Sequence, residues 1–187
     1  MKKLDDPVIL ERFKNGDTSA FKEIVIAYQD NIYELCFRML GDRDNAQDAA
    51  QETFLKAYQG IGRFEPDASI YTWLYRIGVN TCIDYKRRSA LESFFRRPFS
   101  SGDAIEQEPS DAPSPERLAE SKQAAAALQK ALGKLSHKLR AVIVMKEIEE
   151  LSYEDIAKVL DISLGTVKSR ISRAREELKR LVAETHL

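Results

Sequence analysis

Hydrophobic residues recur along this chain at intervals of three and four positions, which is the spacing of one face of an α-helix. The pattern predicts one long helix over residues 17–40, and Gly41 is expected to end it in the left-handed conformation. A second helix is predicted over residues 44–58 and a third over residues 69–88, with Ser69 as its N-cap. The first half of the chain is therefore expected to be helical.

A stretch rich in Pro, Ser, Asp and Glu interrupts this pattern. Four of the six prolines fall between Pro98 and Pro115, where periodic hydrophobic residues are almost absent, so a flexible, extended linker is predicted. The linker, residues 96–115, separates a domain over residues 1–95 from a second over residues 116–187. No strand-like alternation occurs, and the predicted fold class is all-α, with two small helical domains.

The second domain is expected to hold helices over residues 115–132 and 136–147, followed by two helices within residues 151–178. Ser152, with Asp155 three residues later, is expected to form a capping box at the first of these two helices. Ser163 is expected to cap the second, and Asp161 to take the left-handed conformation in the turn. The predicted inward residues are Ile156, Leu160, Ile162, Val167, Ile171, Ala174 and Leu178.

A short helix, a tight turn and a second helix with a basic outer face predict a helix-turn-helix, which places its second helix in the major groove of DNA. Side chains off the buried face of that helix are candidates for contacts with base edges and phosphates. They are Thr166, Lys168, Ser169, Ser172, Arg173 and Arg175. An ordinary helical hairpin with a solvated face is the alternative, and the agreement of caps, turn and charge favours the DNA-binding motif.

Aromatic and cationic residues are interleaved over residues 64–88. This mixture suits single-stranded nucleic acid, because bases stack on rings while cations hold the backbone, and an amide such as Asn80 can pair with an unstacked base. The candidates are Phe64, Tyr71, Trp73, Tyr75, Arg76, Asn80, Arg87 and Arg88. A position in the hydrophobic core is the alternative for Tyr71 and Tyr75.

The helix predicted over residues 44–58 has two faces. Small residues and Phe54 form the face expected to be buried. The other face carries Asp48, Gln51, Glu52 and Leu55. An exposed leucine bordered by acids and an amide suits docking against helices of another protein, and a solvated helix face is the alternative.

Composition narrows the class of protein. The net charge is −1, yet acidic residues are concentrated in residues 42–52 and 103–120 and basic residues in residues 76–97 and 168–180. Because the acidic segments repel phosphates, the chain alone is expected to bind DNA weakly. The two cysteines, Cys36 and Cys82, are predicted to be reduced thiols in the hydrophobic core. Both lie far in sequence from the two histidines, so no metal site and no cofactor are predicted. With no apolar run of about 20 residues and no signal peptide, a cytoplasmic protein is expected.

Three segments together resemble the bacterial RNA polymerase sigma factors of the extracytoplasmic-function (ECF) group. DNAQDAAQETFLKAY (residues 44–58) looks like the family's helix that binds core polymerase. FEPDASIYTWLYRIGVNTCIDYKRR (residues 64–88) looks like the segment that melts and reads the −10 promoter element. SYEDIAKVLDISLGTVKSRISRAREEL (residues 152–178) looks like the helix-turn-helix that reads the −35 element.

The resemblance implies roles and partners. Contacts with the β′ clamp helices of polymerase would involve Asp48, Gln51, Glu52, Phe54 and Leu55. Asn80 would contact a flipped −10 base, in a pocket formed by residues 64–71 and bordered by Trp73, Tyr75 and Arg76. Lys168, Ser169, Ser172 and Arg173 would read the −35 element. The implied partners are core polymerase (β′ clamp and β flap), promoter DNA as duplex and melted strand, and an anti-sigma factor, often membrane-bound in the family. No catalytic residue, cofactor or small-molecule substrate is implied.

Two other classes of function stay open. A self-sufficient helix-turn-helix regulator would need a symmetric dimer and a palindromic site. A nuclease would need Asp42, Asp44, Asp48 and Glu52 as metal ligands, although these residues suit a docking face better.

Overall fold

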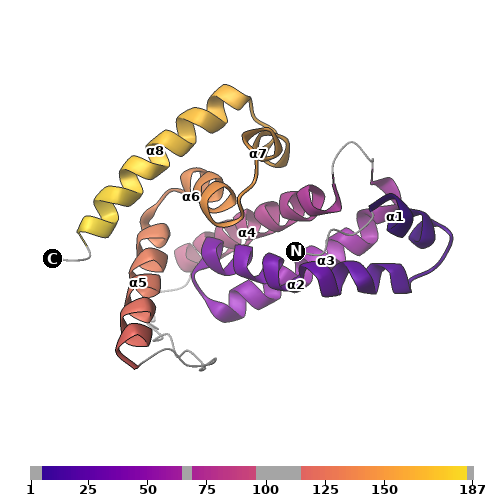
Figure 1. Cartoon of the computed structure of the whole chain (residues 1–187), viewed down its shortest axis with the longest axis horizontal. Helices are drawn as coiled ribbons and strands as arrows, with labels where there is room; N and C mark the ends of the chain where they lie inside the picture. The colour runs from indigo at the N-terminus through magenta and orange to yellow at the C-terminus, as the bar shows by residue number, and fades with distance from the viewer. Residues whose placement is uncertain (1–5, 65–68, 96–114, 185–187) are drawn as a thin grey trace.

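The computed structural model describes residues 6–64, 69–95 and 115–184, and nearly all of them lie in helices (Figure 1). The first domain contains α1 (Asp6–Lys14), α2 (Ser19–Leu40), α3 (Arg43–Gly60), a 3₁₀ turn (Ile61–Arg63) and α4 (Ile70–Phe95). The second contains α5 (Pro115–Lys134), α6 (His137–Ile143), a π-helical turn η2 (Val144–Ile148), α7 (Tyr153–Leu160) and α8 (Leu164–Ala183). These ranges hold no strand, which confirms the all-α fold class.

Helix boundaries follow the predictions closely at several ends. Gly41 ends α2 with φ 81°, and its N–H donates to the Phe37 carbonyl at 2.8 Å. Ser69 accepts from the Thr72 N–H at 3.1 Å and so caps α4, which continues to Phe95, beyond the predicted residue 88.

Helix α1 is not among the predicted helices, although its residues Ile9 and Leu10 are buried in the core. A short apolar run directly after Pro7 is the only local signal for this helix. The predicted linker lies outside the described residues, apart from Pro115, which begins α5.

The first domain is built on close packing among α2, α3 and α4. Three alanines of α3, Ala46, Ala49 and Ala57, are fully buried. A Cβ atom placed on Gly78 of α4 would lie 3.1 Å from Cδ2 of the buried Leu35. Small residues therefore allow these three helices to approach one another.

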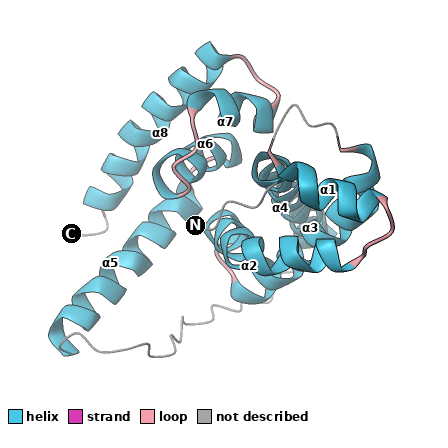
Figure 2. Ribbon diagram, turned by 45° about the vertical axis from the view of Figure 1, so that its right-hand side comes forward, coloured by secondary structure: helices cyan, strands magenta, loops and turns pink. Residues whose placement is uncertain are grey.

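The two domains are in direct contact in the structure (Figure 2). Helices α5 and α6 and the turn η2 pack against α2, and α7 packs against α4. One cluster of buried hydrophobic residues includes members of both domains. This contact determines which side of α4 stays open to solvent.

Candidate nucleic-acid and protein interfaces

Side-chain caps define the helix-turn-helix formed by α7 and α8. Ser152 accepts from the Asp155 N–H at 3.0 Å, and Ser163 accepts from the Thr166 N–H at 3.2 Å, as predicted. The Asp155 carboxylate accepts from the Ser152 hydroxyl at 2.6 Å, so the reciprocal bond goes to the side chain and not to the backbone N–H of a capping box. Asp161 takes the left-handed conformation, with φ 51°, and closes the turn.

The structure differs from the predicted inward residues at three positions, of which Ile162, in the turn, is half-buried. Ile156 is buried with Val159, whereas Leu160, the last residue of α7, is only half-buried. Helix α7 ends at this point, so Leu160 has less of the neighbouring helix to cover it. On α8 the expected residues are buried except Leu178, which is half-buried, and the stripe continues to Leu181.

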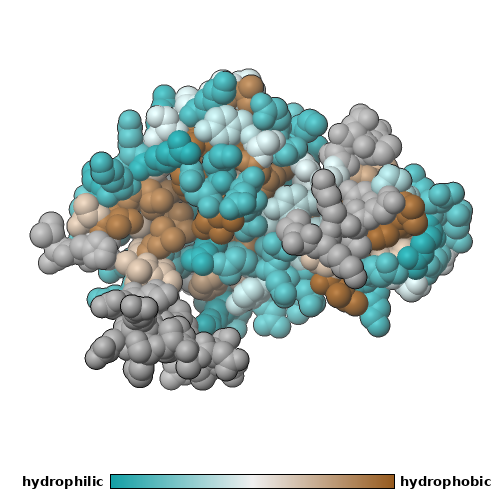
Figure 3. Space-filling view, viewed as in Figure 1, coloured by the Kyte–Doolittle hydropathy of each residue, from teal (hydrophilic) through white to brown (hydrophobic). Residues whose placement is uncertain are grey.

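The outer face of α8 is open to solvent. The exposed candidates are Lys168, Ser169, Ser172, Arg173 and Arg175, while Thr166 is half-buried. Hydrophilic residues, coloured teal, cover much of the outer edge along α8 (Figure 3). The structure thus brings the predicted duplex-reading side chains together on one exposed helix.

Arg175 differs from Arg173 because it already has a protein partner. Its Nε and Nη2 both donate to the Glu147 carboxylate, at 2.9 and 2.6 Å. Nothing local in the sequence indicates this pair, because Glu147 lies 28 residues earlier, in η2. Arg173 makes no ion pair within the part of the chain that the structure describes, so its guanidinium is available for a base or phosphate.

Helix α4 presents a polar stripe to solvent. Arg76, Asn80 and Arg87 are exposed, and Trp73 lies on the same side, half-buried. The indole meets the buried Phe64 ring edge-on, with centroids 5.1 Å apart. Phe64 therefore supports Trp73 from the core, and residues 65–68 of the predicted base pocket lie outside the described residues.

The opposite side of α4 corrects the prediction for Tyr75. This residue is fully buried, and its hydroxyl donates to the Glu149 carboxylate. Tyr75 and Asn80 are five residues apart, or about 140° around a helix, and so face different ways. Tyr71, half-buried on the Tyr75 side, donates to the Glu149 carbonyl at 3.3 Å. Neither ring borders the exposed stripe in this arrangement.

Burial also changes the acid–base properties of this buried pair. Removal from water and the adjacent Glu149 carboxylate raise the pKa of the Tyr75 phenol far above its usual range. Burial likewise raises the pKa of Glu149, although the hydrogen bond from Tyr75 opposes the shift. Glu149, which was not predicted as a functional residue, thus links η2 to α4.

Two arginines near the C-terminal end of the polar stripe on α4 form ion pairs with carboxylates. Arg87 lies 3.8 Å from Asp84, and Arg88 lies 3.7 Å from Glu52 on α3. The Glu52 carboxylate also pairs with Lys56 at 2.8 Å. Glu52 therefore belongs both to the predicted docking face and to the surroundings of Arg88.

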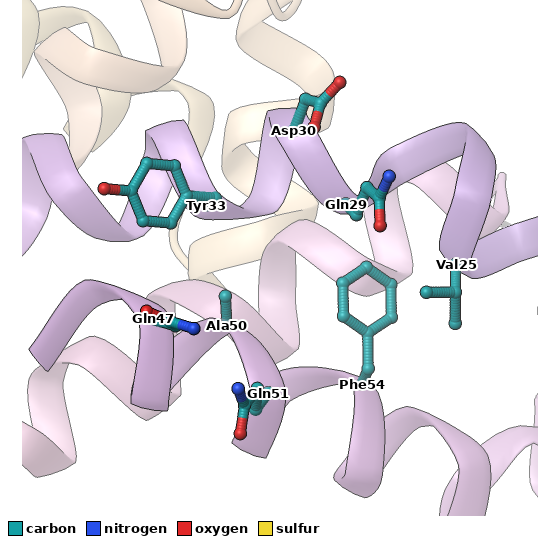
Figure 4. A pocket seen from close by; sticks show the side chains of 8 residues that line it. All are labelled: Val25, Gln29, Asp30, Tyr33, Gln47, Ala50, Gln51 and Phe54. Atoms are coloured by element: carbon teal, nitrogen blue, oxygen red, sulfur yellow. The ribbon is translucent and has the colours of Figure 1, made fainter. Parts of the chain in front are cut away.

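The predicted docking face of α3 lies beside a groove. Asp48, Gln51 and Leu55 are exposed, Leu55 with 57% of its surface accessible, whereas Glu52 and Phe54 are half-buried. Between α2 and α3 lies a groove of about 410 Å³, in which the Phe54 ring points from α3 towards α2 (Figure 4). Its lining is Val25, Gln29, Asp30, Tyr33, Gln47, Ala50, Gln51 and Phe54.

Other types of site find little support in the described ranges 6–64, 69–95 and 115–184. They contain no group of three or more His, Cys, Asp or Glu side chains able to hold a metal ion. Cys36 and Cys82 are buried free thiols. No helix there is long and apolar enough to span a membrane.

Comparisons with known proteins agree with this geometry. Residues 24–92 match the family described as Sigma-70 region 2, and residues 125–178 match Sigma-70, region 4. The chain is 39% identical over 174 residues to the ECF RNA polymerase sigma factor SigW of Bacillus subtilis, covering 91% of this chain and 93% of that protein. It is 39% identical over 183 residues to the ECF RNA polymerase sigma-E factor of Escherichia coli, covering 94% and 93%.

Solved structures are similar over both domains. The sigma factor RpoE in complex with the anti-sigma factor NepR from Bartonella quintana matches with a TM-score of 0.69 and 26% identity, covering 87% of this chain and 96% of that one. CnrH in complex with the cytosolic domain of CnrY matches with a TM-score of 0.69 and 27% identity, covering 96% and 97%.

Proposed function

Because the chain belongs to the sigma-70 family of RNA polymerase sigma factors, and within it to the ECF group, we propose that it binds core RNA polymerase and directs initiation at promoters with −10 and −35 elements. The observation that carries the proposal is the presence of both regions, in order, each with an exposed surface of suitable chemistry. A single-strand-reading stripe and a duplex-reading helix in one chain suit a protein that holds a duplex at one point and melts it at another.

We assign recognition of the −35 element to the outer face of α8. Ser169, Ser172 and Arg173 are exposed together, and the N-terminal half of a recognition helix is the part that enters the major groove. Lys168 and Thr166 flank them. Arg175, which is bound to Glu147, is assigned to the DNA backbone or to the support of α8.

Recognition and melting of the −10 element are assigned to the exposed stripe of α4. Asn80 supplies donors and an acceptor for the edge of an unstacked base, and Trp73 supplies a ring about two turns away on the same side of α4. Arg76 and Arg87 supply charge for the phosphates of the melted strand. Arg88 extends this charge, whereas Tyr75 is excluded because it is buried.

Binding to core polymerase is assigned to α3 and the groove beside it. Leu55 and Phe54 offer apolar contacts, and Asp48, Gln51 and Glu52 offer polar ones, which is the composition of a helix-docking surface. The β′ clamp helices are the proposed partner there, and the β flap is the proposed partner of the second domain.

Control by an anti-sigma factor is also proposed. One structural relative of this chain was solved with an anti-sigma factor bound and another with the cytosolic domain of CnrY bound, and the similarity covers both domains. With this we propose the domain limits 1–95 and 116–187, an intervening linker at 96–115, a cytoplasmic location and no enzymatic activity of the chain itself.

The test is transcription by bacterial core polymerase from a library of promoter fragments, with and without this protein. Initiation that depends on the protein and shares one upstream motif would support the proposal. Absence of initiation, together with symmetric binding to a palindrome by the chain alone, would replace it with a self-sufficient regulator.

A further inference from the structure

Two free thiols lie inside the first domain, and the proposed function makes no use of them. Cys36 of α2 and Cys82 of α4 are both fully buried. The thiol of Cys82 is hydrogen-bonded to the thiol of Cys36, so the two sulfur atoms are neighbours. The residues are 46 positions apart in sequence, and only the packing of α2 on α4 brings them together.

The alignment of these two helices explains why the thiols meet. The rings of Tyr28 and Tyr71 lie 6.0 Å apart between centroids, and further along the same contact Leu35 lies against Gly78. Helices α2 and α4 therefore run side by side in the same direction. The first cysteine directly follows Leu35, and the second lies one helical turn after Gly78, on the same face of α4. The next side chains along the contact are thus the two thiols.

Gly78 also brings the two backbones close together at this point. A Cβ atom placed on it would lie 3.1 Å from Cδ2 of Leu35, so a larger residue would push the helices apart. A disulfide requires two Cα atoms about 4.4–6.8 Å apart, a separation that facing helices reach where their backbones approach closely. Glycine and cysteine, one turn apart on α4, provide that approach.

The surroundings keep Cys82 unreactive while the helices are packed. The hydrogen bond with Cys36 and burial raise the pKa of the Cys82 thiol far above its usual range. Because the thiolate is the form that reacts with oxidants, this sulfur is inert until the contact between α2 and α4 opens locally and admits water. Oxidation is therefore expected to be slow and to depend on that opening.

We propose that Cys36 and Cys82 are a modification site at which a hydroperoxide forms a disulfide that fastens α2 to α4. With hydrogen peroxide, one thiol adds to a peroxide oxygen as its thiolate, the O–O bond breaks, and a sulfenic acid and one water molecule result. The second thiol attacks the sulfenic sulfur, the S–S bond forms, and a second water molecule leaves. The two thiols lose two electrons and two protons, which the peroxide takes up, and a dithiol reductant reverses the change.

The disulfide would leave the exposed stripe of α4 uncovered. Asn80 and Cys82 are two residues apart, or about 200° around the helix, and so face opposite sides. A bond that closes a loop of this length stabilises the folded domain chiefly by constraining the unfolded chain. The oxidised chain is therefore expected to resist unfolding and to keep the surface assigned to the −10 element. Only this last point rests on the proposed function.

The test treats the full chain with hydrogen peroxide, blocks the remaining thiols with iodoacetamide, and maps tryptic peptides by mass spectrometry. Trypsin releases residues 23–38 and 77–86, each with one of the two cysteines and no methionine, so oxidised methionine does not alter their masses. A linked pair that lacks two hydrogens and is separated by dithiothreitol is expected. Linked chains are expected to unfold at a midpoint roughly 10 °C higher. Cys82→Ala and Cys36→Ala are the controls and should show neither change.

A second arm tests the need for opening. Gly78→Ala overpacks the contact between α2 and α4 and is expected to speed the cross-linking roughly fivefold or more. Gly133→Ala, in the second domain with nothing within 4 Å of the new Cβ, is the matched control and should not speed it. Equal rates in the two variants would overturn the dependence on opening.

Three results would overturn the modification site itself: sulfinic acids on separate peptides, a link between two chains, or two thiols that stay reduced in the folded chain. An unchanged unfolding midpoint in linked chains would overturn the fastening of α2 to α4. Binding of a single-stranded −10 oligonucleotide is expected to be equal in the linked and reduced chains. Loss of binding in the linked chain alone would overturn the preserved surface, whereas cross-linking with no binding by either form would overturn only the proposed function.

Discussion

The carboxylate of Glu52 lies 3.7 Å from the guanidinium of Arg88, so an ion pair joins the proposed docking face of α3 to the C-terminal part of α4. The same carboxylate binds Lys56, whose Nζ also donates to the buried Thr81 hydroxyl at 3.1 Å. A partner that takes up Glu52 would therefore free Arg88 for a phosphate. We therefore expect this pair to couple the proposed binding of polymerase to the proposed binding of the melted strand.

Glu52→Gln is expected to increase the affinity of the free chain for a single-stranded −10 oligonucleotide. An exposed ion pair contributes roughly 0.2–1 kcal/mol, so release of Arg88 should strengthen binding by up to about fivefold. Asp48→Asn removes the same charge from an exposed site that has no ion pair among the described residues, and it serves as the control. Equal effects of the two changes, measured by fluorescence anisotropy, would show general repulsion and no coupling through Arg88.

Asn80→Ala is expected to impair promoter melting and to leave binding to core polymerase unchanged. Loss of a base contact costs about 1–3 kcal/mol, which corresponds to roughly 5- to 150-fold less open complex. Permanganate reactivity of the melted strand measures it, and Gln59→Ala on the exposed side of α3 is the control. Normal melting by the Asn80 variant would remove this residue from −10 recognition.

Arg173 and Arg175 are expected to behave differently when each is changed to Ala. Loss of Arg173 should weaken binding to an intact −35 element by about 1–3 kcal/mol and relax specificity at one base pair. Loss of Arg175, which is held by Glu147, should weaken all sequences alike. Affinities of the holoenzyme for intact and scrambled −35 elements separate these outcomes. The reverse pattern would exchange the two roles.

Helices and caps were predictable because their signals are local. The spacing of hydrophobic residues located α2, and side chains such as Ser152 and Ser163 marked helix starts within three residues of their partners. The left-handed conformation of Asp161 in the tight turn could likewise be predicted, because aspartate tolerates a positive φ better than most residues. These features depend on neighbours in sequence.

The sides of α4 could not be assigned in this way. Tyr75 and Trp73 are both aromatic residues among cations, and the burial of Tyr75 depends on Glu149, which lies 74 residues further along the chain. The bond from Arg140 to the Met39 carbonyl spans 101 residues. Such pairs leave no periodic signal, so the contact between the domains appears only in three dimensions.

The contact that Glu149 makes between the two domains is expected to weaken as pH rises. Burial raises the pKa of Glu149 above its ordinary value of 4.5, so the arrangement in which Glu149 is packed between the domains favours the protonated acid. Its contribution to the contact between the domains is therefore fully present below that ordinary value and declines as pH rises through the raised pKa. The groups that face Glu149 are Tyr71, Tyr75, Glu34 and Arg38.

The distance between spin labels at Lys22→Cys on α2 and Lys179→Cys on α8, two exposed positions, measures this dependence. The quantity followed is the fraction of chains in which the two domains are in contact, between about pH 5 and pH 8. Glu149→Gln keeps the shape of the side chain and is expected to flatten the profile, while Glu154→Gln should leave it unchanged. An unchanged slope in the Glu149 variant would assign the dependence to another group.

Two helical glycines are expected to respond oppositely to replacement by Ala. At Gly78 the new Cβ would lie 3.1 Å from Leu35 Cδ2 and 3.7 Å from Thr53 Cγ2, and both neighbours are buried. Overpacking of this kind costs about 1–3 kcal/mol, which exceeds the gain of up to about 1 kcal/mol in helix propensity. At Gly133 nothing lies within 4 Å, so only the gain remains. Thermal unfolding should show a lower midpoint for Gly78→Ala and a higher one for Gly133→Ala, and a higher midpoint for both would mean that α2 and α4 can move apart without cost.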